Sequence, residues 1–270
     1  MTKMFELLNF EFMQRALLMA VISGFACGLL GVFVVLLRMS FIGICVSHAA
    51  FAGALIGLWL GFAPALCGFV GSVGATAFIG TWSRKFRVSS DTVVGVVFSV
   101  MLSLSMLVLG MLPGSRAEGL NFLWGNLLTA TTTDLVAMAG CSVVLLGFIF
   151  LFFKEIQAVI SQRDAAEASG IPVKALSIAI LLLMGLVIAV ALKAVGGVLI
   201  YALIVTPAAT ALQSVKTLKG MFILSAAWGV AASVIGLVLA YYLSLPTGAS
   251  VVLTATVFLI LARIFTKKDA

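Results

Sequence analysis

The single histidine of the chain is the first place where metal chemistry could occur. His48 lies inside a long uncharged stretch, where a neutral imidazole can ligate a borderline metal ion. Cys45 stands three residues earlier, so its thiol and the imidazole would share one face of a helix. The alternative for a lone buried histidine is a hydrogen-bonded core residue. The spacing leaves both interpretations open.

Hydroxyl groups in a second apolar stretch could line a path through the protein. They belong to Tyr201, Thr206 and Thr210. The alternative for a threonine in an apolar helix is a hydrogen bond to the carbonyl four residues earlier. Pro207 lies in the same stretch and lacks a backbone N–H. Together with the preceding Gly196 it indicates an interrupted helix, and a simple kink at the proline is the alternative.

Neither enzyme chemistry nor ATP binding is indicated by the sequence. Ser47 and His48 are adjacent and would point in different directions on a helix, so they make no catalytic dyad. The chain contains no G-x-x-x-x-G-K-[ST] loop that could cradle ATP phosphates. The four cysteines lie in apolar stretches without C-x-x-C spacing, which argues against a disulfide framework or a structural zinc cluster. We expect a chain that is not an enzyme and binds no cofactor of its own.

The elements that position these residues follow from composition. Hydrophobic residues make up 63% of the 270 residues and charged residues only 9%, against roughly 25% charged in a soluble domain. A membrane-spanning helix needs roughly 20 apolar residues. The uncharged runs are 16–37, 39–83, 92–115, 135–153, 175–192, 194–215 and 220–262.

The two runs longer than 40 residues must each hold two spans, which gives nine helices, or eight if one segment is re-entrant. No hydrophilic stretch is long enough to form a second domain. We therefore predict an all-α polytopic membrane protein, a bundle of 8–9 transmembrane helices forming one domain over residues 1–270.

The basic residues indicate how this bundle is oriented. With nine spans, twelve of the sixteen lysines and arginines fall on one side of the membrane. The other four are Lys3, Arg15, Arg116 and Lys193. By the positive-inside rule, the N-terminus is then outside and the C-terminus cytoplasmic. The basic residues stand at span ends and form no patch, so the net charge of +7 does not indicate nucleic-acid binding. Asp91 and Asp134 also stand at span ends and predict helix caps.

The longest hydrophilic segment, residues 154–174, falls on the cytoplasmic side. Its acidic residues precede Gly170, and Pro172 follows. We therefore predict a short amphipathic helix at about 155–171 that ends at a glycine C-cap and turns back into the membrane at the proline. A helix that lies across the membrane face would be a docking element.

Several motifs in this order point to one family. Asp164-x-x-Glu167-Ala168-x-Gly170-Ile171 looks like the coupling helix of ATP-binding-cassette (ABC) importers, which seats in a groove of the nucleotide-binding subunit. Arg38-Met-Ser-Phe-Ile-Gly43, followed by Ser47-His48-Ala49 and Gly53, resembles the second-helix signature of the zinc/manganese/iron permeases of these importers. Residues 198–211 resemble the pore-proximal segment of that family, and Leu245-Pro246-Thr247-Gly248 resembles its late turn.

The resemblance implies a multi-pass permease subunit in a bacterial-type cytoplasmic (inner) membrane, surrounded by lipid, that moves a divalent transition-metal ion inward by alternating access. It also implies partners: cytosolic ATP-binding subunits that use the ATP, a second permease copy as a homodimer, and an extracytoplasmic metal-binding protein. Members typically carry an acidic residue four positions before the histidine, where this chain has Ile44. A carboxylate favours manganese, so its absence leaves the softer pair Cys45 and His48 and favours zinc over manganese or iron.

The alternative function is a secondary, ion-coupled transporter without an ATPase partner. Such a carrier normally needs buried ionisable residues. Between Leu17 and Ser83 the only arginine, lysine, histidine, aspartate or glutamate residues are Arg38 and His48. Residues 220–262 carry no charge. The scarcity of coupling groups favours a permease that draws its energy from a partner.

Overall fold

A computed structural model describes residues 10–85, 90–112 and 116–266, and all regular secondary structure in these ranges is helical. The helices are α2 (Glu11–Leu36), α3 (Ser40–Leu60), α4 (Pro64–Lys85), α5 (Ser90–Met111), α6 (Arg116–Trp124), the short 3-10 helix η1 (Leu127–Thr129), α7 (Thr132–Leu151), α8 (Phe153–Ser161), α9 (Arg163–Ala168), α10 (Val173–Val195), α11 (Gly197–Ser214), α12 (Leu218–Leu243) and α13 (Thr247–Thr266).

Nine of the described helices have 18 or more residues, one for each span that the sequence predicts. Seven of the nine are long and apolar enough to cross a membrane. The other two, α4 and α11, contribute shorter apolar stretches, Pro64–Ile79 and Leu199–Ser214. The prediction of an all-α polytopic bundle is confirmed.

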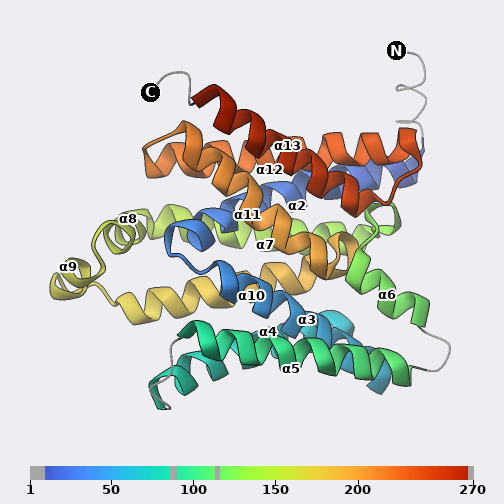
Figure 1. The fold of residues 1–270 in the computed structure, drawn as a ribbon, viewed down its shortest axis with the longest axis horizontal. Helices are drawn as coiled ribbons and strands as arrows, with labels where there is room; N and C mark the ends of the chain where they lie inside the picture. Colours follow the sequence, from blue (N-terminus) through green and yellow to red (C-terminus); the bar gives the residue numbers. More distant parts are fainter. Residues whose placement is uncertain (1–9, 86–89, 113–115, 267–270) are drawn as a thin grey trace.

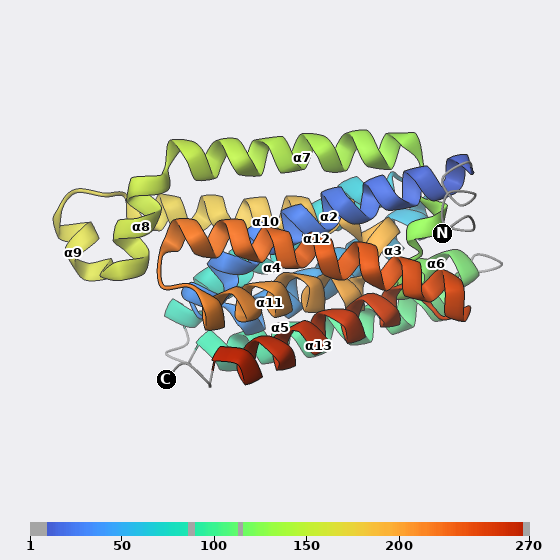
Figure 2. The same cartoon turned by 90° about the horizontal axis from the view of Figure 1, so that it is seen from above.

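The long helices run side by side in one bundle, with the remaining helices at its two ends (Figures 1 and 2). The helices α8 and α9 project from one end, which we call the α9 end, and α6 lies at the other, the α6 end (Figure 2). The helix α2 begins at the α6 end, and α13 finishes at the α9 end. An odd number of crossings therefore separates the two ends of the chain, as the distribution of basic residues predicts.

Close backbone contact joins α2 to α12 at glycines. A Cβ atom on Gly24 would lie 2.5 Å from the carbonyl oxygen of Gly229, so no larger residue fits there without a shift of the backbone. One turn further along, the Ser225 hydroxyl donates a hydrogen bond to the Gly28 carbonyl at 2.6 Å. Small residues at such interfaces let helices approach closely in lipid, where burial of apolar surface gives no driving force between helices.

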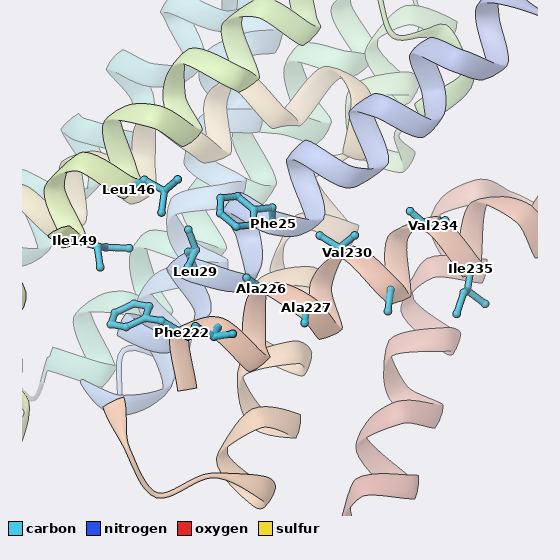
Figure 3. Close-up of a pocket in the computed structure, with 12 residues that line it drawn as sticks. Phe25, Leu29, Leu146, Ile149, Phe222, Ala226, Ala227, Val230, Val234 and Ile235 are labelled. Atoms are coloured by element: carbon cyan, nitrogen blue, oxygen red, sulfur yellow. The ribbon is translucent and has the colours of Figure 1, made fainter. Parts of the chain in front are cut away.

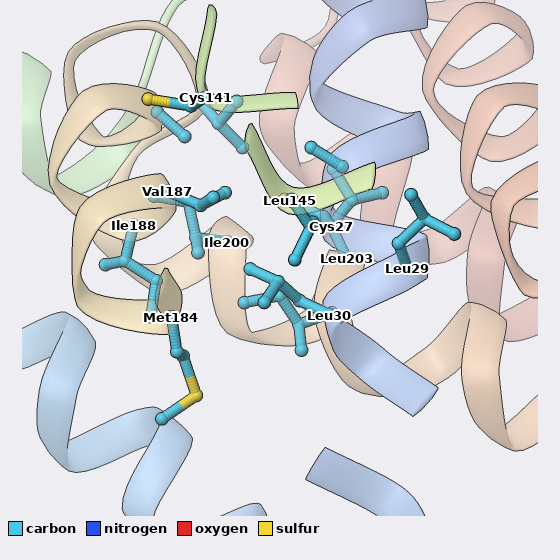
Figure 4. Close-up of a cluster of buried hydrophobic side chains, with 14 of the residues drawn as sticks. Cys27, Leu29, Leu30, Cys141, Leu145, Met184, Val187, Ile188, Ile200 and Leu203 are labelled. Carbon is cyan, nitrogen blue, oxygen red and sulfur yellow. The ribbon is translucent and has the colours of Figure 1, made fainter. Parts of the chain in front are cut away.

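In the part of the core that Figure 4 shows, side chains from α2, α7, α10 and α11 pack together. Leu30, Leu145, Ile188 and Ile200 are at most 1% exposed. Cys27 and Cys141 pack among these residues. All four cysteines of the chain lie in described helices and carry free thiols.

Two breaks between consecutive spans fall where glycine and proline predict them. Gly196 takes a φ of +88° between α10 and α11, and Ser244, with a φ of +52°, ends α12 just before Pro246. Pro207, in contrast, lies inside a continuous α11. The interruption of the helix is therefore confined to Gly196, whose backbone contacts Trp124 and Gly125 at the end of α6.

Candidate functional site

The first candidate site surrounds His48, in the middle of α3. The side chain is 9% exposed, and its ring meets Phe98 of α5 edge to face, with the ring centroids 4.9 Å apart. Its Nδ1 is buried and has no hydrogen-bond partner among the described residues. Because buried polar atoms are nearly always paired, the interpretation of His48 as a fully hydrogen-bonded core residue does not account for Nδ1.

Cys45 faces the same neighbours as His48. It is fully buried in a cluster with residues of α4 and α5, and Phe98 packs against this cluster. The i, i+3 spacing thus places both side chains toward α5. No group of three or more His, Cys, Asp or Glu side chains that could hold a metal ion occurs in the described part of the chain. Within one copy, Cys45 and His48 would supply two ligands at most.

The residues on α11 that were predicted to line a path differ in their surroundings. Tyr201 lies against α3, where its ring stands 3.6 Å from the position that a Cβ atom on Gly43 would take. Thr206 is half-buried, whereas Pro207 and Thr210 are buried. The Thr210 hydroxyl donates to the Thr206 carbonyl at 2.8 Å, which is the alternative that the sequence left open for this threonine.

A polar contact at the α6 end links α7 to α10. Asp134 forms a capping box with Thr131 at the start of α7, so the predicted cap is confirmed. The Lys193 ammonium also lies 3.1 Å from the Asp134 carboxylate, beside a cavity of about 320 Å³. Sequence reasoning missed this ion pair, although it placed both residues at span ends. The side chain of Asp91, the other predicted cap, lies outside the described residues.

The second candidate site is the α8–α9 segment, which holds two helices where the sequence predicted one. Gln162 is extended (φ −152°, ψ 97°) and separates α8 from α9. The α8 residues Ile156 and Val159 are buried against the bundle. The predicted single helix over 155–171 is therefore wrong in this detail, because the chain changes direction after α8 buries its apolar face.

The end of α9 is fixed by a glycine, as predicted. Gly170 has a φ of +84°, and its N–H donates to the Glu167 carbonyl at 3.1 Å. The Ile171 N–H donates to the Ala166 carbonyl at 3.1 Å, which completes a Schellman motif. Ile171 packs against the core, while Glu167, Gly170 and the remaining predicted contact residues Asp164 and Ala168 are exposed.

These features define a polytopic helical membrane protein with an apolar interior and one polar segment projecting from an end. A family model described as "ABC 3 transport family" matches residues 9–266, and the chain belongs to this family.

Similar proteins cover nearly the whole chain. The manganese transport system membrane protein MntC of Listeria monocytogenes is 32% identical, over 97% of this chain and 94% of its own length. The manganese import system permease protein ScaB of Streptococcus gordonii is 33% identical, over 93% of this chain and 91% of its own. A solved structure of PsaBC from Streptococcus pneumoniae in complex with Fab superposes with a TM-score of 0.90 at 32% identity, covering 97% of this chain and 94% of that one. The resemblance to metal-transporting ABC permeases inferred from the motifs is confirmed.

Proposed function

We propose that this chain is the transmembrane subunit of an ABC importer that passes a divalent transition-metal ion into the cell by alternating access. The family match over residues 9–266 carries the proposal, supported by relatives named for manganese transport. The end of the bundle that bears α8 and α9 would face the cytoplasm, and the α6 end would face an extracytoplasmic metal-binding protein.

Energy would come from ATP hydrolysed by separate cytosolic subunits that dock on α9. Asp164 and Glu167 are exposed and present carboxylates to a partner, while Ile171 and the Schellman motif tie the segment to the bundle. A movement imposed on α9 would then reach α10 directly, since Val173 begins that helix two residues after Ile171. A second copy of the permease, as a homodimer, would complete the path, because one copy brings only Cys45 and His48 to the candidate metal site.

The cargo that the relatives' names favour is manganese. Zinc is the second candidate, because Ile44 offers no ligand where a carboxylate would suit manganese, and Cys45 with His48 is a softer donor pair. Weak binding of either manganese or zinc is compatible with transport, because a transport site must also release its ion.

A secondary transporter is the less favoured function. Among the described buried residues there is no Asp, Glu, Lys or Arg, and coupling to protons or sodium normally needs such groups within the membrane.

The experiment that tests the proposal is elemental analysis of cells that lack the permease gene and of the same cells complemented with it. We expect deletion to lower cellular manganese, or zinc, and complementation to restore it. Complementation beside a partner ATPase with an inactivated phosphate loop should restore nothing. Full restoration with the inactive ATPase would overturn the proposal and favour the secondary transporter.

A further inference from the structure

The surface of the bundle carries an apolar groove of about 700 Å³ (Figure 3). Its floor is α2, at Phe25 and Leu29, and one wall is α7, at Leu146 and Ile149. The other wall is α12, from Phe222 to Ile235. Every side chain that lines the groove is a hydrocarbon.

The groove lies between helices that are expected to cross the hydrocarbon core of the membrane. All three helices that line it are long and apolar enough to span a membrane. On α12 it begins at Phe222, one turn after the helix starts at Leu218 at the α9 end, and passes the middle of the helix. Ile223 and Ile235 on its rim are 63% and 43% exposed. The groove is thus open to the leaflet at the α9 end.

The groove is long enough for an extended hydrocarbon chain. Phe222 to Ile235 corresponds to about 20 Å along the α12 axis at 1.5 Å per residue. Together with the purely apolar lining, this length suits an acyl chain that lies along α12.

Basic residues stand at the α9 end of the groove. Lys219 lies three residues before Phe222 and four before Ile223, on the same face of α12. Lys216, three residues before Lys219, lines a second hollow of about 590 Å³ at the same end of α12. Both lysines are exposed.

Neither lysine has an acidic partner within the described ranges, where the ion pairs are Arg15–Glu11, Lys174–Glu167 and Lys193–Asp134. Gln157, Ser161 and Thr217 add polar groups to the hollow around Lys216. Basic and polar groups at the end of α12 where the apolar groove begins complement a molecule with an anionic head and a hydrocarbon tail.

We propose that this groove binds an anionic glycerophospholipid of the leaflet at the α9 end, with an acyl chain between α7 and α12 and the phosphate at Lys216 and Lys219. The site is independent of the cargo and goes beyond the transport function. The ligand is bound by hydrocarbon burial along the groove and selected by charge at its end.

The test is native mass spectrometry of the full chain in its assembled complex, exchanged into mixtures of phosphatidylglycerol and phosphatidylcholine with identical acyl chains. We expect phosphatidylglycerol to be retained in preference to phosphatidylcholine. Since each lysine near a membrane surface favours an anionic lipid about fivefold, Lys216→Gln with Lys219→Gln should reduce this preference by about 25-fold. Lys174→Gln, which removes a lysine at the same end outside the groove, should leave it unchanged.

Filling the groove tests the position of the acyl chain. Ala227→Phe should lower retention of both lipids, and Ala231→Leu should lower it by less. Val143→Phe adds similar bulk on an exposed part of α7 outside the groove and should have no effect. If Ala227→Phe is not recovered as folded protein, the Ala231→Leu result decides.

Equal retention of the two lipids by the unmodified chain would overturn the proposal. So would a groove-filling variant that keeps its lipid but separates paired copies of the chain, because the groove would then be a protein interface.

Discussion

Around His48 the described side chains are apolar and closely packed, whereas the α8–α9 segment exposes Asp164 and Glu167 beyond the end of the bundle. The first region has two side chains of types that can ligate a metal ion, Cys45 and His48, but no charge with which to drive transport. The second has charge and exposure, but the hollow that its α8 residues help to line has no His, Cys, Asp or Glu among the described residues around it. Under the proposed function, passage of the cargo and delivery of energy are separated in space, and the helices between the two regions would transmit movement.

The largest effect is expected at a close contact between two helices of the interior. Gly24→Leu would force α2 away from α12, because even a Cβ atom lies 2.5 Å from the Gly229 carbonyl oxygen. We expect a loss of more than about 3 kcal/mol and little folded protein, measured by fluorescence-detected size-exclusion chromatography. Gly140→Leu is the control, because a Cβ atom there meets nothing within 4 Å. Equal recovery of the two variants would show that the interior is looser than described.

The next effect concerns α9. Replacing Glu167 with Arg and Gly170 with Val should reduce uptake at least about tenfold, as expected when an interface loses a principal contact, while ATP hydrolysis and complex assembly persist. Valine at the positive φ of Gly170 would strain the Schellman motif. Uptake and hydrolysis are measured on the same proteoliposomes. Unchanged uptake with normal assembly would contradict the assignment of α9 as the coupling element.

His48→Ala tests the interior directly. If the imidazole contacts the cargo, removing it should lower metal uptake roughly 10-fold, the scale seen when a metal site loses a supporting group. Ser47→Ala is the matched control, because the neighbouring buried hydroxyl only donates to the Ile44 carbonyl of its own helix. The measurement is radiometal uptake by both variants. Equal uptake rates for His48→Ala and Ser47→Ala would mean that His48 only packs in the interior.

The smallest effect is expected at the hydrogen bond between α12 and α2. Ser225→Ala removes the donor to the Gly28 carbonyl and should lower the free energy of unfolding by about 0.6 kcal/mol, the average for such bonds between membrane helices. Unfolding in a denaturing detergent measures it. A loss of several kcal/mol would mean that this contact, and not the glycine packing, holds the two helices together.

Much of the fold follows from the sequence, because hydropathy and charge act on each segment separately. The nine long helices match the uncharged runs, and Gly196 and Ser244 mark breaks that glycine, proline and loop chemistry predict. The helix α6 and the division at Gln162 were not predicted, since a polar segment shows no periodicity that distinguishes one helix from two.

The candidate site was less predictable than the fold. Spacing placed Cys45 and His48 on one face of α3, but not against Phe98, which lies 50 residues further along the chain. Asp134 and Lys193 are likewise far apart in the sequence and meet only in the folded bundle. Such contacts depend on how helices pack together, and one sequence carries no local signal for them.

The most direct test of this separation is reconstitution of the purified permease into proteoliposomes, with and without its ATP-binding subunits, and measurement of radiometal uptake. The account predicts uptake only when the ATP-binding subunits and ATP are both present, and none in response to a proton or sodium gradient alone. Gradient-driven uptake by the permease alone would contradict it.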